Sequence, residues 1–153
     1  MVVIETECAV IETLLVLGAS GDLAGRLLLP AVGQLLNSVE GPPMLTVVGA
    51  GTEVWDEATW RERVSNAFAS VNATGPQIEN TVATTRYLTA DVTNPGDLHR
   101  LLDACQGAPA IYFALPPAVT AKACAALSEV PLPPGTAFVL EKPFGVINPA
   151  PLT

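Results

Sequence analysis

Short apolar runs alternate along this chain with longer segments in which apolar residues recur every three or four positions. The runs have the length and composition of strands buried on both faces of a sheet, and the recurrence is that of amphipathic helices. The pattern predicts strands at Thr13–Leu17, Leu45–Val48, Thr85–Thr89, Ala110–Leu115 and Gly135–Leu140, and helices at Leu23–Asn37, Trp55–Val71, Gly96–Cys105 and Ala118–Val130. A strand is thus followed by a helix throughout, which indicates a parallel sheet with helices on both faces and right-handed crossovers.

Three local features refine these elements. Asp22 stands where it can cap the first helix, and Pro30 inside that helix is expected to weaken or bend it, because proline lacks an N–H group. The polar stretch Asn72–Thr85, which contains Gly75-Pro76, is interpreted as loop or incomplete helix.

The first strand runs into a glycine-containing turn, Gly18-Ala19-Ser20-Gly21-Asp22-Leu23-Ala24. Glycines at a strand-to-helix turn permit a tight bend and let the backbone approach a pyrophosphate, which the helix N-terminus attracts. The spacing is a variant of the usual dinucleotide-binding pattern, and a glycine pattern alone is weak evidence. Its place between the first strand and the first helix favours a dinucleotide-binding, Rossmann-like fold over a purely structural turn.

Composition narrows the class of protein. With 153 residues, half of them hydrophobic, the chain suits one domain spanning residues 1–153. A net charge of −8 with only seven Lys and Arg argues against a nucleic-acid partner, and no apolar run approaches the length of a membrane span. The acidic N-terminal residues do not resemble a secretory signal, and the three cysteines are widely spaced, so we expect a cytoplasmic protein with free thiols.

Three segments together resemble one enzyme family. Gly18–Ala24 followed by Pro30 is similar to the N-terminal coenzyme motif of glucose-6-phosphate dehydrogenases, and Tyr112–Pro117 and Glu141–Gly145 look like that family's next two signatures, in the right order. The resemblance covers about residues 13–145 and corresponds to the coenzyme domain of a longer enzyme. It implies an oxidoreductase that converts glucose 6-phosphate and NADP to 6-phosphogluconolactone and NADPH, in the pentose phosphate pathway.

The resemblance also implies roles for individual residues. It places the cofactor at Gly18, Ala19, Ser20, Gly21, Asp22, Leu23 and Ala24, and also at Thr52, Pro116 and Lys142. Lys142 would face both the coenzyme and the phosphate of the sugar, as suits an ammonium group at the C-terminal tip of a strand. The family further implies a cis peptide bond before Pro143.

The chain departs from the family pattern at the positions that bear on nucleotide preference. The family commonly has a basic residue where this chain has Leu27, and an arginine for the extra phosphate of NADP where this chain has Thr52. The following Glu53 suits the ribose diol of NAD, or is simply a solvated surface charge. Arg61 or Arg63 of the next helix can also supply the cation. NADP is the cofactor that the resemblance implies, with NAD as the alternative, and the sequence alone does not decide between them.

The catalytic histidine motif of the family would lie beyond residue 153. The only histidine is His99, which the helical pattern interprets as an exposed helix residue. The chain is therefore expected to be a truncated piece that binds cofactor without catalysing, with a homo-oligomer as a further expectation. The rival hypotheses are a stand-alone NAD(P)-binding regulatory module and, third, a sugar-nucleotide epimerase or reductase, for which no suitably spaced Tyr and Lys pair is present.

Overall fold

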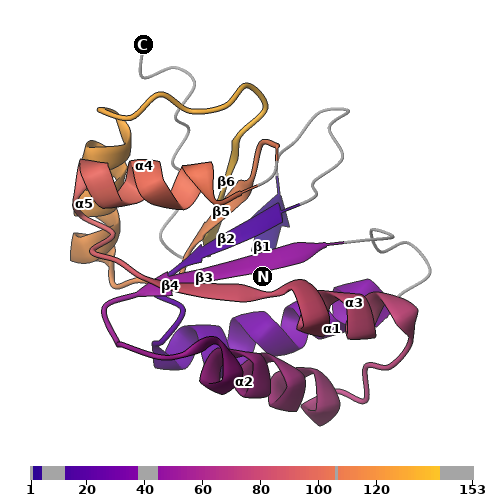
Figure 1. Cartoon of the computed structure of the whole chain (residues 1–153). Coiled ribbons are helices and arrows are strands. Elements are labelled where there is room, and N and C mark those ends of the chain that lie inside the picture. Colours follow the sequence, from indigo (N-terminus) through magenta and orange to yellow (C-terminus); the bar gives the residue numbers. More distant parts are fainter. Residues whose placement is uncertain (1, 5–12, 38–44, 106, 142–153) are drawn as a thin grey trace.

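A six-stranded sheet forms the centre of the computed structural model, which describes residues 2–4, 13–37, 45–105 and 107–141 (Figure 1). The strands are β1 (Val2–Ile4), β2 (Thr13–Leu17), β3 (Thr46–Gly51), β4 (Arg86–Thr89), β5 (Ala110–Phe113) and β6 (Ala137–Glu141). The helices are η1 (Ala24–Leu28), α1 (Leu29–Asn37), α2 (Glu57–Ser70), α3 (Pro76–Thr84), α4 (Pro95–Asp103) and α5 (Pro117–Leu127).

The strand order is β1-β6-β5-β2-β3-β4, and the five strands β2 to β6 are parallel to one another. The predicted parallel sheet of the α/β class is therefore confirmed. The sequence pattern missed β1, which pairs antiparallel with β6 through Val3 and Leu140. A three-residue strand is too short to show a period, so only its pairing partner reveals it.

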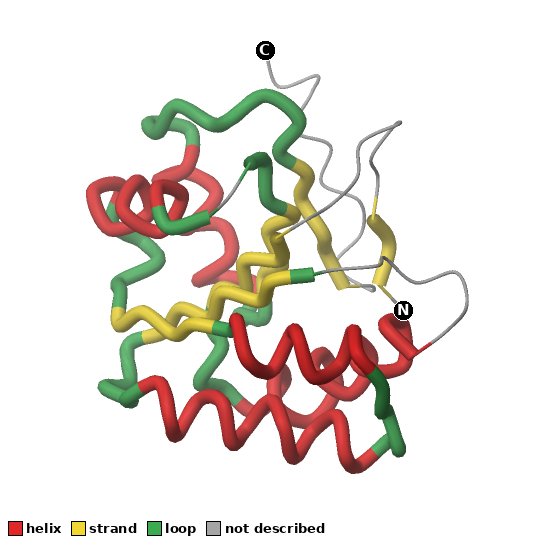
Figure 2. Tube along the Cα trace, turned by 45° about the vertical axis from the view of Figure 1, so that its right-hand side comes forward, coloured by secondary structure: helices red, strands yellow, loops and turns green. Residues whose placement is uncertain are grey.

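Helices cover both faces of the sheet, as Figures 1 and 2 show. Alternate side chains of β2 point to opposite faces: Leu14 and Val16 join the core beneath α1, α2 and α3, whereas Leu15 and Leu17 join the core beneath α4 and α5. All four side chains are at most 6% exposed. Burial on both faces explains why β2 is a continuous apolar run with no alternation of polar residues.

The first helix departs from the predicted one in two ways. It has a wide π-helical turn over Ala24–Leu28, where the N–H of Leu29 donates to the carbonyl of Ala24, five residues back. The turn lies directly before Pro30, which has no N–H group to continue the α-helical ladder, so the expected irregularity takes this form. Asp22 is not the cap: its carboxylate forms an exposed ion pair with Arg26 at 2.8 Å.

The stretch expected to be loop contains the nine-residue helix α3. Gly75 and Pro76, which suggested a turn, are instead its start: Gly75 takes the N-cap position with φ of +121°, and Pro76 takes the first turn, where its missing N–H costs nothing. The side chain of Thr81 then donates to the carbonyl of Leu45, at 2.8 Å, and buries this polar residue against the sheet.

No helix in the described ranges combines the length and the apolar character needed to cross a bilayer.

Candidate functional site

The connections of the sheet change direction at the C-terminal ends of β2 and β5. From β2 the chain moves outward to β3 and β4, and it then crosses to the other side of β2 to form β5 and β6. Connections on the two sides of such a switch point leave the sheet in opposite directions, and ligands of open α/β sheets bind there. The glycine turn after β2 and the corner between β5 and α5 are the two segments that border this switch point.

Gly18 brings these two segments into direct backbone contact. Its φ is +86°, and a Cβ atom added there would collide with the carbonyl oxygen of Ala114 and lie 2.7 Å from Cδ2 of Leu115. The N–H of Ala114 in turn donates to the carbonyl of Leu17 at 2.9 Å, which fixes the separation of the two strand ends. Gly18 is therefore required for its conformation and for the close approach of β5.

The rest of the turn is held by the end of β3. The N–H groups of Gly18 and Ala19 both donate to the carbonyl of Ala50, each at 2.9 Å. Gly21 donates to the carbonyl of Gly18 at 3.0 Å, so the turn closes on itself before the helix begins. Gly21 and Asp22 are exposed at this helix start, whereas Ala19 and Ala24 are fully buried beneath it. The start of the helix is thus exposed at Gly21 and Asp22, and the side chains of Ala19 and Ala24 anchor the turn to the core.

Ser20 points from the turn toward β3 and β4. A Cβ atom on Gly51 would lie 2.6 Å from Oγ of Ser20 and 3.0 Å from the phenol oxygen of Tyr87, so Gly51 leaves room for both. The Ser20 side chain is hydrogen-bonded to Tyr87, and burial raises the pKa of this phenol against the lowering effect of that bond. Tyr87 donates to the carbonyl of Glu53 at 2.7 Å, which ties the segment after β3 to β4.

The segment after β3 contains the residues that the sequence analysis expects to bear on nucleotide preference. Thr52, Glu53 and Val54 are all exposed at the C-terminal edge of the sheet, beside the glycine turn. The Glu53 carbonyl also accepts from the hydroxyl of Thr89, at 3.2 Å. The backbone of this segment is therefore fixed, while its side chains face outward.

Arg63 of α2 lies against the glycine turn. Its guanidinium donates through Nη2 to the carbonyl of Gly21 and stands 5.3 Å from the centre of the Trp55 ring. A Cβ atom on Gly25 would occupy the place of this guanidinium, so the absence of a side chain at Gly25 makes room for it. Arg61, the other candidate from the same helix, donates instead to the carbonyl of Val82 in α3, at 2.9 Å, and lies away from the turn.

The remaining predicted residues are distributed as follows. Pro116 is exposed at the N-cap of α5, two residues beyond the Ala114 carbonyl that contacts Gly18. Lys142 and Pro143 lie outside the described residues, so their roles and the expected cis bond stay predictions. His99 lies on α4, more than half exposed, with its Nδ1 3.5 Å from a carboxylate oxygen of Asp103.

The sequence did not identify Tyr87 or Trp55 as neighbours of the turn. Their rings are 5.4 Å apart, and Tyr87 also lies 5.7 Å from the buried ring of Trp60. A sequence signal existed for Arg63, which follows Trp60 by three positions on the apolar stripe of α2 and therefore lies at the edge of the buried face. No comparable signal links Tyr87 to Ser20, because 67 residues separate them and only the parallel pairing of β3 with β4 brings them together.

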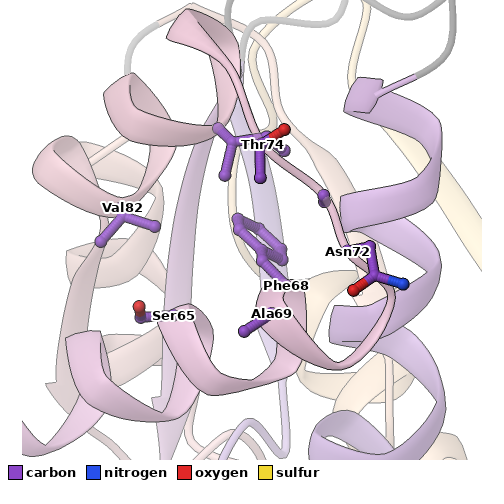
Figure 3. Close-up of a pocket in the computed structure, with 8 residues that line it drawn as sticks. Ser65, Phe68, Ala69, Asn72, Thr74 and Val82 are labelled. Carbon is purple, nitrogen blue, oxygen red and sulfur yellow. The ribbon is translucent and has the colours of Figure 1, made fainter.

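A cavity of about 350 Å³ lies elsewhere, between the C-terminal half of α2 and α3 (Figure 3). The ring of Phe68 lines it, with Asn72 and Thr74 at its rim. Thr74 is hydrogen-bonded to Asn37 at the end of α1, and α3 contacts Leu45 before β3 begins, so this cavity is at the opposite edge of the sheet from the glycine turn. It has no part in the site described above.

Comparison with known proteins gives one consistent result. The family model "Glucose-6-phosphate dehydrogenase, NAD binding domain" matches residues 15–148. Glucose-6-phosphate 1-dehydrogenase from Dickeya dadantii (strain 3937) is 30% identical over 139 residues, which cover 86% of this chain and 28% of that protein. The enzyme of the same name from Bacillus subtilis (strain 168) is 28% identical over 144 residues, covering 86% of this chain and 29% of that protein.

Solved structures show the same fold. The crystal structure of glucose-6-phosphate 1-dehydrogenase from Mycobacterium avium superposes with a TM-score of 0.73 at 24% identity, over 88% of this chain and 30% of that chain. A glucose-6-phosphate dehydrogenase in complex with its substrate glucose-6-phosphate gives a TM-score of 0.71 at 19% identity, over 91% of this chain and 32% of that chain.

The chain thus spans less than a third of the length of these relatives, and the part that it spans is a nicotinamide-dinucleotide-binding domain. The family model covers most of the chain, including all of β2 except Thr13 and Leu14 and every element from the glycine turn to β6. The chain therefore belongs to the family of the NAD binding domain of glucose-6-phosphate dehydrogenase.

Proposed function

We propose that this chain is the coenzyme-binding part of an oxidoreductase that oxidises glucose 6-phosphate to 6-phosphogluconolactone with NADP as the preferred coenzyme and NAD as the alternative. The observation that carries this proposal is the backbone contact between Gly18 and Ala114 at the switch point of the sheet, in a chain that matches the family over residues 15–148. Relatives bearing the name glucose-6-phosphate 1-dehydrogenase support the substrate.

The residues of the turn fit a dinucleotide. Gly21 is exposed at the helix start, so a ligand can approach its backbone closely. A side chain at this position would cover that surface, and its Cβ atom would lie 3.2 Å from the carbonyl oxygen of Gly18. Gly18 to Ala24 would hold the pyrophosphate, and Thr52 and Pro116 would border the adenosine and nicotinamide ends respectively. When bound, the nicotinamide supplies the hydride acceptor.

By resemblance to the family, the general base that takes the hydroxyl proton of the sugar is expected to be a histidine. His99 lies on α4 and is paired with Asp103 on the same helix. The chain by itself is therefore proposed to bind coenzyme without turnover, and Lys142 is proposed to meet the sugar phosphate beside the coenzyme. The free thiols of Cys105 and Cys124 support a cytoplasmic location for the enzyme.

Titration of the purified chain with NADP and with NAD tests the proposal, with Gly21→Trp as the blocking variant. We expect the wild-type chain to bind and the variant to lose most of its affinity, because the indole would stand where the pyrophosphate must lie. Gly96→Trp is the matched control, since Gly96 is also an exposed glycine at a helix start, in α4.

Binding by Gly21→Trp as tight as by wild type would contradict the site, and a wild-type chain that binds neither nucleotide would contradict the function itself. Turnover of glucose 6-phosphate by the chain alone would show that the proposed lack of a base is wrong.

A further inference from the structure

We infer that Arg63 is the residue that selects NADP over NAD in this chain, by receiving the 2′-phosphate of the adenosine ribose. The inference rests on the proposed coenzyme function and deepens it. Its starting point is a cation that the structure holds beside the phosphate-binding turn without a carboxylate partner among the described residues.

The location of Arg63 matches the ribose end of a bound dinucleotide. In this class of fold, the coenzyme ribose lies beside the tip of the strand that follows the first helix, here β3. The guanidinium lies between the carbonyl of Gly21, in the turn, and the ring of Trp55, which follows β3 by four residues. It therefore borders both the phosphate turn and the segment where the 2′ substituent must be recognised.

The hydrogen bonding of Arg63 is incomplete. A guanidinium has five N–H donors, and the structure gives this one a single hydrogen-bond acceptor, the carbonyl of Gly21. Its Nε is buried and has no partner among the described residues. Unpaired donors on a partly buried cation favour an anionic partner, and the planar fork of arginine suits a phosphate.

Most of the other described arginines are paired with a carboxylate, whereas Arg63 is not. Three of them form ion pairs with acidic residues: Arg26 with Asp22, Arg86 with Glu57 and Arg100 with Asp97. In a chain of net charge −8, three of the five arginines are thus already paired with a carboxylate. Arg61 also lacks a carboxylate within the described part, but its contact with Val82 points it toward α3.

Two features hold the guanidinium in place before any ligand binds. Gly25 leaves the space that it occupies, and the Trp55 ring lies beneath it in a cation–π contact. Because the guanidinium is already held in place, it loses little side-chain freedom when a ligand binds. Little of its interaction free energy with the ligand is therefore offset by the ordering of the side chain. This arrangement gives the chain a 2′-phosphate contact from α2, although Thr52 occupies the strand tip.

The competing group is Glu53, whose carboxylate is exposed at the tip of β3 and would repel a 2′-phosphate. Its backbone is fixed by Tyr87, but the structure gives its side chain no partner among the described residues. The inference therefore predicts that Arg63 outweighs Glu53, so that the net preference is for NADP.

The test compares adenosine 2′,5′-bisphosphate with adenosine 5′-monophosphate, alongside NADP and NAD, in titrations of the wild-type chain and Arg63→Met. The two members of each pair differ only in the 2′-phosphate. We expect Arg63→Met to weaken the two 2′-phosphorylated ligands by about tenfold or more, as for loss of a charge-assisted hydrogen bond, and the other two by less than about threefold. Arg63→Lys should be intermediate, and Arg61→Met is the matched control that should leave both ratios unchanged.

An equal loss of all four ligands in Arg63→Met would overturn the inference and assign Arg63 to holding the turn through Gly21. Unchanged binding of all four would also overturn it. A wild-type chain that binds none of the ligands would instead refute the proposed function, and the inference with it. Urea denaturation of each variant establishes that the affinities refer to folded protein.

Discussion

Replacing Gly18 with alanine tests the joint between β2 and β5, on which the site depends. Two separate penalties are expected. A non-glycine residue at φ of +86° costs roughly 1–2 kcal/mol, because its Cβ crowds the neighbouring backbone. The new Cβ would also meet the carbonyl oxygen of Ala114, and forcing an extra methyl group into a packed site costs about 1–3 kcal/mol more.

The second penalty depends on how far β5 can retreat. A flexible side chain such as Leu115 can turn aside, but the Ala114 backbone is tied to Leu17 by the 2.9 Å hydrogen bond. We therefore expect the two terms to add, to roughly 2–5 kcal/mol of unfolding free energy. At about 2–4 °C per kcal/mol for a chain of this size, the melting temperature should fall by about 4–20 °C.

Gly135→Ala separates the two terms. Gly135 has φ of +92°, close to that of Gly18, but an added Cβ would only make ordinary contact with Ala108 at 3.4 Å. This control should lose the backbone term alone, roughly 1–2 kcal/mol. Urea unfolding followed by tryptophan fluorescence measures both variants. Equal losses in Gly18→Ala and Gly135→Ala would refute the reasoning, since the contact with Ala114 would then contribute nothing.

Three further predictions concern the support of the fold. Thr85→Val should lower the unfolding free energy by about 2–3 kcal/mol in urea titrations. The Trp60 indole N–H would lose its acceptor at 2.8 Å, and the Val47 carbonyl would lose its donor at 2.7 Å. Thr84→Val is the control and should change the unfolding free energy little, because the hydroxyl of Thr84 is exposed. Asn94→Ala removes the cap of α4, in which the Asn94 side chain accepts from the N–H of Asp97 at 3.0 Å, and should lower the unfolding free energy by about 1 kcal/mol. Asn94→Ser should retain most of the lost stability, because serine can also cap a helix. Equal melting temperatures for the two variants would contradict the capping role. Burial raises the pKa of the Cys105 thiol to about 11, so a variant that keeps only this cysteine should react slowly with alkylating reagents at pH 8 and faster as the pH rises from 9 toward 11; rapid labelling at pH 8 would show that the thiol is not buried in this way. Because the pKa of Cys105 is raised in the folded state, protonation of this thiol stabilises the fold. This stabilisation is fully present below pH 9 and is lost as the pH rises through 11.

The order and type of most elements could be predicted from local pattern. Six elements fall within about three residues of their expected bounds: the strands β2, β5 and β6 and the helices α2, α4 and α5. In each of them the apolar residues that set the predicted period are the ones that the core buries. Local signals failed at α3, where Gly75 and Pro76 start a regular helix in a stretch that the pattern interpreted as loop or incomplete helix. The strand β3 was predicted, but it continues three residues beyond its expected end at Val48. The added residues Gly49, Ala50 and Gly51 are small and leave little apolar signal, but they give room to Trp60 and Ser20.

Part of the candidate site could be predicted from the sequence. The glycine turn could be found, because the requirement for a glycine at the positive φ of Gly18 is local to the chain. Its surroundings could not, since Tyr87 reaches Ser20 only through the pairing of β3 with β4, and Ala114 reaches Gly18 only through the pairing of β2 with β5.

The sequence by itself determined the class of fold and the position of the glycine turn, because hydrophobic period and glycine conformation are properties of neighbouring residues. Only the tertiary structure decided between Arg61 and Arg63, which lie two positions apart on α2. A separation of two residues turns their side chains by about 200° around a helix, so one meets Val82 of α3 and the other meets the turn at Gly21. Which of the two faces the glycine turn depends on how α2 is rotated against η1, and the packing of Trp60 and Val64 into the core sets that rotation.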